Sequence, residues 1–413
     1  MSPRILRRGL TIGAVEGSMV IRQMAQLPRI GVSNRYSVSA NEQVPTRELT
    51  LILDSDTGLL SLGNNFTVNE LRHSHEWLKY QEPEAHCLAL GEEVLKLAKI
   101  PEGVGVAGLS WKDAGLIDSC ARFGHDTTIL YPSAQQRGNS PEFGTWERDS
   151  IDVQELISND DLGVSGPQFS FLSARHILEH AMSLEHFMLG LATKVKPDGY
   201  VLLEVPDCED AVRYLDYSII WEEHIHYFTA SSLERTLQRL GWRLVELQQK
   251  TVEAEAVLIA IVQPPIISSA VVAPKESRET YIEQERFAAN FSELRVRLSS
   301  LLNAAKQAGN TLYLLGANHT ASNFIDLFGV AGLFSGCLDD NPNKQGKYIS
   351  SLNVPIIAVD PLRLEGNSFI ISAINPGRAE AAERKLVYYL ESRVIIRRVS
   401  ALIRFLGNFE GTV

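Results

Sequence analysis

Histidine and acidic residues stand side by side at two places in the sequence. Glu179 is followed by His180, and Glu223 is followed by His224. An imidazole can accept and release a proton near neutral pH, and a neighbouring carboxylate could orient it. Each pair is therefore a candidate for acid–base chemistry. The alternative is that these polar side chains brace a loop or the start of a helix.

A glycine-containing segment follows a short apolar run earlier in the chain. It reads GLSWKDAG over residues 108–115, and the apolar residues before it predict a short buried strand. A glycine at the end of such a strand allows the backbone to approach a ligand closely.

The pattern of apolar residues predicts the elements that would position these groups. Strands are expected at residues 103–109, 127–131, 169–174, 200–205, 243–248 and 255–262, and helices at 83–100, 114–123, 184–195 and 231–240. Such alternation is typical of a parallel sheet with crossover helices. His180 then follows the carboxyl end of a strand, which is where open α/β sheets bind their ligands.

The chain continues into a second, smaller α/β unit. A charged helix is expected at residues 277–307, followed by strands at 312–315, 332–339, 355–359 and 368–373 and helices at 321–328 and 378–392. We therefore expect an α/β protein with two Rossmann-like sheets. The predicted division is an irregular N-terminal cap (1–85), a first domain (86–263), a linker with a connecting helix (264–310) and a C-terminal domain (311–413).

Composition and charge narrow the possible ligands. The 413 residues carry a formal net charge of -11 and the pI is near 5.5, which argues against binding to nucleic-acid phosphates. A charged small molecule is the expected ligand. The four cysteines form no CxxC pair and favour a reducing cytoplasm. No apolar run is long enough to cross a bilayer.

Four runs of the sequence resemble one enzyme family, the class I methyltransferases that C-methylate nucleotide-linked keto sugars. The last run is similar to a stretch in the C-terminal domain of those proteins. The resemblance extends over about residues 85–375. Its runs are ARHILEH (174–180), VKPDGYVLLEVPD (195–207), WEEHIHYFT (221–229) and LDDNPNKQGKY (338–348).

The resemblance implies S-adenosylmethionine as cofactor and a nucleotide-activated keto-deoxysugar as substrate. His224 matches the catalytic histidine of the family and would remove the proton next to the ketone, with Glu223 and His180 beside it. The implied reaction passes through an enolate. The residues expected to contact the cofactor are Gly108, Ser110, Asp113, Gly115, Tyr131 and Arg175.

The sequence departs from the family pattern at several places. The N-terminal zinc cysteines of the family are missing, because no cysteine precedes Cys87, so we expect no metal. The glycine turn after the first strand is degenerate, Tyr131 replaces the acidic partner of the cofactor ribose, and Trp221 replaces a tyrosine. An alternative is therefore a methyltransferase-like protein that binds a sugar nucleotide, or serves as a structural partner, without methyl transfer. An oxidoreductase using the second unit is disfavoured because that unit lacks a GxGxxG motif.

Overall fold

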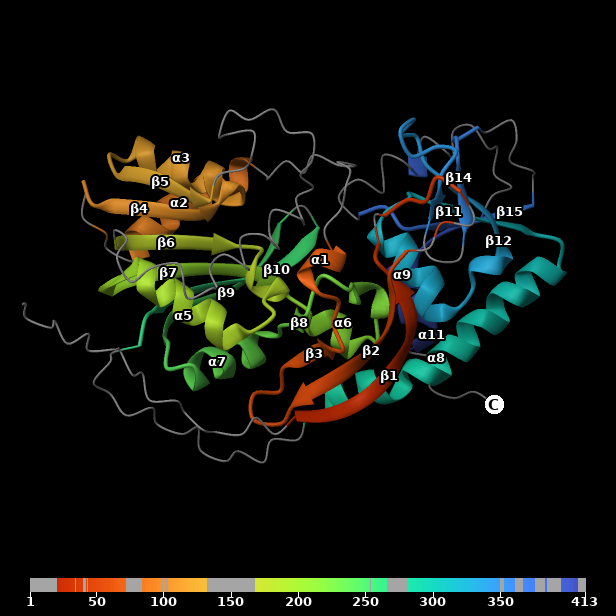
Figure 1. Ribbon diagram of the computed structural model, residues 1–413, viewed down its shortest axis with the longest axis horizontal. Coiled ribbons are helices and arrows are strands. Elements are labelled where there is room, and N and C mark those ends of the chain that lie inside the picture. The colour runs from red at the N-terminus through yellow and green to blue at the C-terminus, as the bar shows by residue number, and fades with distance from the viewer. Residues whose placement is uncertain are drawn as a thin grey trace, which may run out of the picture.

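The protein is described here from a computed structural model. The structure describes residues 21–33, 35–39, 42, 44–71, 84–97, 100, 103–131, 168–252, 254–265, 281–349, 353–360, 367–375, 383–384 and 395–407. Two α/β lobes lie at opposite ends of the long axis, and a small antiparallel sheet lies between them (Figure 1).

The first lobe is a six-stranded sheet with the order β5-β4-β6-β7-β10-β9. β4 pairs in parallel with β5 and β6, β6 pairs in parallel with β7, and β10 runs antiparallel to both of its neighbours. The expected α/β class is confirmed. The strands are β4 (Gly105–Ser110), β5 (Asp126–Tyr131), β6 (Phe169–Arg175), β7 (Val195–Pro206), β9 (Arg243–Val252) and β10 (Glu255–Gln263).

β7 begins earlier than the sequence predicted. Phe169 pairs with Val195 and Phe171 with Tyr200, with an irregularity between the two pairs. The proline, aspartate and glycine at residues 197–199 therefore interrupt the pairing locally without ending the strand.

Two pairs of helices cover the two faces of this sheet. Alternate strand residues point to opposite faces. Ala107 and Leu109 belong to the core cluster that contains residues of α5 and α7. Val106, from the same strand, belongs to the cluster that contains residues of α2 and α3. The helices are α2 (Glu84–Leu97), α3 (Ala114–Arg122), α5 (Leu184–Lys194) and α7 (Ala230–Arg239).

The second lobe has a six-stranded sheet with the order β13-β14-β12-β11-β15-β16, in which all pairings are parallel except β13 with β14. The helix expected at residues 378–392 lies largely outside the described residues. The strands are β11 (Thr311–Leu315), β12 (Phe334–Leu338), β13 (Tyr348–Ile349), β14 (Val354–Ile357), β15 (Ser368–Ser372) and β16 (Ile395–Arg398). The helices are α9 (His319–Phe328), η5 (Ala331–Leu333) and α11 (Val399–Gly407).

The N-terminal part, expected as an irregular cap with strand-like runs at residues 48–53 and 59–62, forms an antiparallel sheet in which β2 and β3 match those two runs. β1 (Ile21–Gly31), β2 (Thr46–Asp54), β3 (Leu60–Gly63) and β8 (His226–Tyr227) form an antiparallel sheet. β1 was missed because polar residues and Pro28 interrupt its alternation, and its pairing with β2 shifts register twice. β8 comes from the segment assigned to the first domain, so this sheet joins distant parts of the chain.

The N-terminal sheet shares a core with the second lobe. Leu27 of β1 lies in one buried cluster with Phe291 and Phe328. Phe291 belongs to the long helix α8 (Ile282–Gln307), which runs along the lower edge of the second lobe (Figure 1). The Gly31 N–H donates to the Asp326 carboxylate at 2.9 Å. The remaining short helices are α1 (Val68–Leu71), η1 (Trp111–Asp113), η3 (Leu178–His180), α6 (Glu209–Arg213) and η4 (Tyr217–Ile219). Among the described helices, none is both long and apolar enough to cross a membrane.

Gly108 provides a test of how the first lobe packs. A Cβ at this position would lie 2.7 Å from Asp113 Cβ and 2.8 Å from Ile117 Cγ1. Gly108→Ala should therefore lower the free energy of unfolding by about 1–3 kcal/mol, the usual cost of overpacking a core. Urea denaturation followed by circular dichroism measures this change. Gly332→Ala is the control, because no atom lies within 4 Å of its added Cβ. Equal effects of the two substitutions would contradict the packing described.

Candidate active site

The chain turns sharply where β6 ends. His176 has a left-handed φ of 51°, which is uncommon for a residue with a side chain and is found at functional sites. Its N–H donates to the Glu204 carbonyl at 2.7 Å. The turn leads into η3, which carries Glu179 and His180, both buried. The strained turn thus places the first histidine–carboxylate pair at the carboxyl edge of the sheet.

A buried ion pair joins the ends of β6 and β7. The Arg175 Nε–H donates to Glu204 Oε2 at 2.5 Å, and both side chains are at most 1% exposed. His86 Nε2, from α2, lies 2.9 Å from the other carboxylate oxygen. Burial raises the pKa of Glu204, but Arg175, His176 and His86 outweigh it and hold that pKa well below its usual value. Glu204 is therefore a buried carboxylate anion held by a cation.

The loop after β4 is fastened to β6 by side chains from both. Asp113 accepts hydrogen bonds from the Ser110 N–H at 3.0 Å and the Ser173 hydroxyl at 2.6 Å. The buried Lys112 Nζ donates to the His176 carbonyl at 2.6 Å, and Arg175 Nη1 donates to the Lys112 carbonyl at 2.9 Å. These contacts link the ends of β4 and β6. The strand order reverses between these two strands, because the chain continues from β4 to β5 on one side and from β6 to β7 on the other.

The second histidine comes from a turn and not from a strand. The His224 N–H donates to the Trp221 carbonyl at 3.0 Å. The rings of His180 and His224 meet edge to face with centroids 4.7 Å apart, and one Glu179 oxygen lies 3.9 Å from His180 Nε2. The structure therefore brings His180 and His224, the histidines of the two candidate pairs, together, and Glu179 of the first pair lies beside them.

Burial sets the protonation of this cluster. It lowers the pKa of both His180 and His224 well below the usual value, and neighbouring histidines and the Lys112 ammonium lower both further. Burial also raises the pKa of Glu179. His224 Nε2 is buried, and no described residue forms a hydrogen bond with it. The two imidazoles are neutral near pH 7, and His224 can accept a proton.

The other parts of the chain reach the cluster through Trp221. His319, the first residue of α9, stacks on Trp221 with centroids 4.2 Å apart, and burial lowers its pKa to about 4. The Trp221 indole N–H donates to the Ser33 hydroxyl at 2.9 Å, and Ser33 in turn donates to Glu222. Sequence reasoning gave His319 no chemical role, because a glycine turn opening a helix is usually structural.

Glu223 and His226 have structural contacts. Glu223 offers its carbonyl oxygen to His180, whose Nδ1–H donates to it at 2.9 Å. His226 lies 2.9 Å from both the Ser61 hydroxyl and the Ala181 carbonyl. Glu223 therefore orients His180 through its backbone, whereas His226 braces β8 against β3 and η3. Catalytic roles for His224, His180 and Glu223 stay predictions.

The residues expected to contact the cofactor are placed around the same strand ends. A Cβ at Gly115 would lie 3.0 Å from Cys87 Cβ, so this glycine packs against α2. Ser110 and Tyr131 pair in register at the ends of β4 and β5, and the Tyr131 side chain lies outside the described part of the structure. Gly108, Asp113 and Arg175 contact other protein groups. Their role toward a cofactor also stays a prediction.

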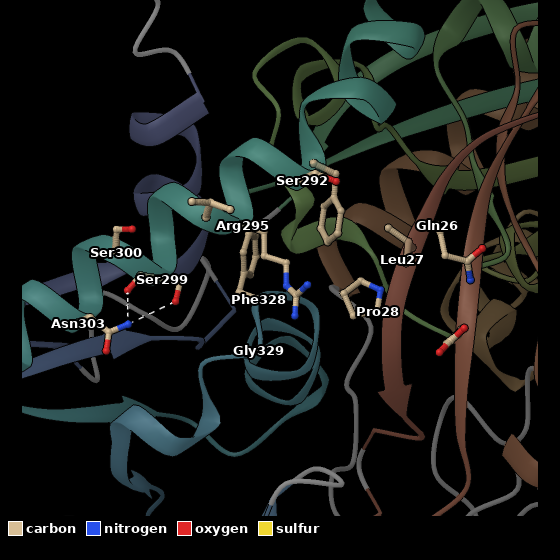
Figure 2. Close-up of a pocket in the computed structure, with 13 residues that line it drawn as sticks. Gln26, Leu27, Pro28, Ser292, Arg295, Ser299, Ser300, Asn303, Phe328 and Gly329 are labelled. Carbon is tan, nitrogen blue, oxygen red and sulfur yellow. Dashed lines mark hydrogen bonds between the residues drawn. The ribbon is translucent and has the colours of Figure 1, made fainter. Parts of the chain in front are cut away.

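A separate open groove lies between β1 and α8, with a volume of about 740 Å³. Figure 2 shows Arg295 of α8 beside Gly329 and Pro28, and Asn303 bonded to Ser299. No histidine or cysteine is among the described residues that line this groove, so its serines have no neighbouring histidine to activate them. The groups able to transfer a proton lie instead at the strand ends of the first lobe.

Two family models match this chain. The "Methyltransferase domain" matches residues 112–247, and the "C-methyltransferase C-terminal domain" matches residues 273–371. The first match contains the strand ends with His180 and His224, and the second contains His319. The curated C-methyltransferase NovU of Streptomyces niveus is 24% identical over 191 residues, which are 44% of this chain and 46% of that protein.

The chain therefore carries both a methyltransferase domain and a C-methyltransferase C-terminal domain, and these matches fit the class I S-adenosylmethionine-dependent C-methyltransferase family. The chain covers less than half of the curated relative's length. Solved structures similar to this chain include the [4+2]-cyclase SpnF, at 12% identity and a TM-score of 0.33 over 48% of this chain and 87% of that one. Another is the 1,6-didemethyltoxoflavin-N1-methyltransferase of Burkholderia thailandensis, at 13% identity and a TM-score of 0.30. That match covers 44% of this chain and 78% of the other.

The class I methyltransferase domain implies S-adenosylmethionine as cofactor. In the loop after β4, the Trp111 indole N–H is buried, and no described residue accepts a hydrogen bond from it. A buried donor without an acceptor is costly and fits a carboxylate supplied by a ligand. Trp111 therefore fits the amino-acid end of this cofactor, although it replaces the usual glycines.

The ion pair at the strand ends gives a prediction about stability. Arg175→Leu leaves the Glu204 carboxylate buried without its main cation, so the free energy of unfolding should fall by about 3–5 kcal/mol. Arg22→Leu removes the exposed pair with Glu285 and should cost about 0–1 kcal/mol. Chemical denaturation of both variants measures the difference. If Arg175→Leu lowered the free energy of unfolding no more than Arg22→Leu, the Arg175–Glu204 pair would not stabilise the strand ends as described.

Proposed function

We propose that this protein transfers a methyl group from S-adenosylmethionine to carbon, next to the ketone of a nucleotide-linked keto-deoxysugar. The observation that supports this most is the partly buried His224, whose neutral imidazole has a nitrogen without a described partner at the carboxyl edge of the sheet. A proton acceptor of this kind is what removal of a proton beside a ketone needs.

The proposed reaction starts with His224. Its Nε2 takes the proton from the carbon next to the ketone, and the C–H electron pair moves to form the enolate. When bound, S-adenosylmethionine would supply an electrophilic methyl group for the enolate carbon, with its sulfur as the thioether leaving group. The ketone is restored, and the imidazolium later returns its proton to solvent.

The positive charge of Lys112 has a role in this scheme. Its ammonium lies near enough to lower the pKa of the His180 and His224 imidazoles. It also lowers the pKa of the Glu179 carboxyl group. A fixed positive charge in a buried site stabilises negative charge that develops on an enolate oxygen. We therefore assign Lys112 to the enolate, in place of the tyrosine hydroxyl that is absent at Trp221.

A second candidate function is binding of a sugar nucleotide without methyl transfer. The contacts of Lys112 and Arg175 across the ends of β4 and β6 favour it. In open α/β sheets, ligands bind at such a point, and here both side chains are buried against backbone carbonyls. The two candidates differ in whether S-adenosylmethionine binds and donates its methyl group.

Proton exchange tests the base without the cofactor. The chain is incubated in D₂O with a nucleotide-linked keto-deoxysugar, and deuterium beside the ketone is followed by NMR. His224→Gln should slow the exchange by about 10²–10⁴-fold, the usual contribution of a general base. His186→Gln, an exposed histidine on α5, should leave the rate unchanged. Exchange at the wild-type rate in His224→Gln would contradict the assignment.

Cofactor binding tests the role of Trp111. Trp111→Phe keeps an aromatic ring but removes the buried N–H donor, so the affinity for S-adenosylmethionine should fall about 10- to 100-fold, as expected for one hydrogen bond to a charged group. Isothermal titration calorimetry measures it. No binding by the wild-type protein would favour the second candidate function, whereas equal binding by both proteins would place the ligand away from Trp111.

A further inference from the structure

Three metal-binding side chains meet at the strand ends, although the sequence predicted no metal site. One ligand atom from each of Glu179, His180 and His224 lies within 4.8 Å of the other two. The three residues come from η3 and from the turn at residues 221–224, which the fold holds together. Two imidazoles and one carboxylate are a donor set that divalent transition metals use in proteins.

The Glu179 carboxylate has an environment that a cation would complete. Its side chain is 1% exposed, and neither oxygen forms a hydrogen bond with a described residue. The nearest ionisable atoms are His176 Nδ1 and His180 Nε2, each 3.9 Å from Oε1. A buried carboxylate is normally paired, hydrogen-bonded or bound to a metal. Burial of the Glu179 carboxylate is therefore costly unless a ligand such as a cation lies beside it.

His180 is already oriented as a metal ligand. Its Nδ1–H donates to the Glu223 carbonyl, which leaves the lone pair on Nε2, the atom nearest Glu179. Histidines that bind metals almost always donate their other ring N–H in this way. His224 completes the set, because its Nε2 is buried and forms no hydrogen bond with a described residue.

We propose that Glu179, His180 and His224 bind one divalent transition-metal ion of the zinc class. Ligand atoms around tetrahedral zinc lie about 3.3 Å apart, given bonds of about 2.0–2.1 Å. Three protein ligands leave a fourth position open, and His224 is only partly buried, so water or a ligand oxygen has access to the ion.

The charges around Glu179, His180 and His224 affect how tightly these residues would bind a metal ion. The Lys112 ammonium opposes a second cation nearby, whereas the buried Glu204 carboxylate, whose charge raises the pKa of Glu179, favours it. The inference does not rest on the proposed methyl transfer. The metal site does constrain the methyl transfer, because an ion bound to His224 Nε2 would prevent this nitrogen from accepting a proton. The metal-bound protein should therefore be unable to exchange the substrate proton.

Cobalt titration tests the site directly. Untagged full-length protein is treated with a chelator, dialysed and titrated with Co²⁺, whose visible absorption reports histidine ligands in a low-coordinate site. The wild-type protein should gain this absorption with one equivalent of Co²⁺, and Zn²⁺ should abolish it. Glu179→Gln and His224→Gln should each weaken Co²⁺ binding more than about tenfold, since even the loss of an outer-sphere partner of a ligand costs 10- to 100-fold.

His186→Gln is the matched control and should bind Co²⁺ as the wild type does. Circular dichroism establishes that each variant is folded, and two independent ligand substitutions keep the test decisive if one of them is not. Absence of the absorption in the wild-type protein, or unchanged Co²⁺ affinity in a folded ligand variant, would overturn the metal site. Proton exchange by metal-free protein would still support the proposed function in that case.

Discussion

The buried pair of Arg175 and Glu204 is the interaction on which the rest of the site depends. An unpaired charge this deeply buried would cost several kcal/mol, so the chain must keep both partners and their further contacts in place. Through those contacts the pair joins the end of β6 to β7, to α2 through His86 and to the loop after β4 through the Lys112 carbonyl. The same strand ends carry the turn at His176, and with it Glu179 and His180.

The site is assembled from parts of the chain that are far apart in sequence. Ser33 follows the N-terminal sheet, His180 and His224 belong to the first lobe, and His319 begins a helix of the second lobe. Trp221 is the residue that contacts all of them. A change in how the two lobes pack would therefore alter the surroundings of His224, which gives the C-terminal domain a physical reason to accompany the methyltransferase domain.

Much of this organisation could be predicted from the sequence, because local patterns determine it. Apolar runs gave most of the strands in both sheets, and the histidine–carboxylate pairs indicated His180 and His224. Tertiary contacts determine the rest. β1 lacks a regular alternation, and its structure depends on packing against α8 and α9. Lys112 received no role from the sequence, and only the fold reveals that it is buried. His319 lies almost 100 residues from His224 in the sequence, and no local pattern connects them.

The central claim is that the carboxyl edge of the first sheet, from Trp111 to His224, is the functional site of this chain. A crystal structure of the protein with S-adenosylhomocysteine, the product form of the cofactor, tests this most directly. We expect the ligand carboxylate at the Trp111 indole N–H and the sulfur directed toward His224. Density for the ligand elsewhere on the protein, or an unchanged empty edge at saturating ligand, would contradict the account.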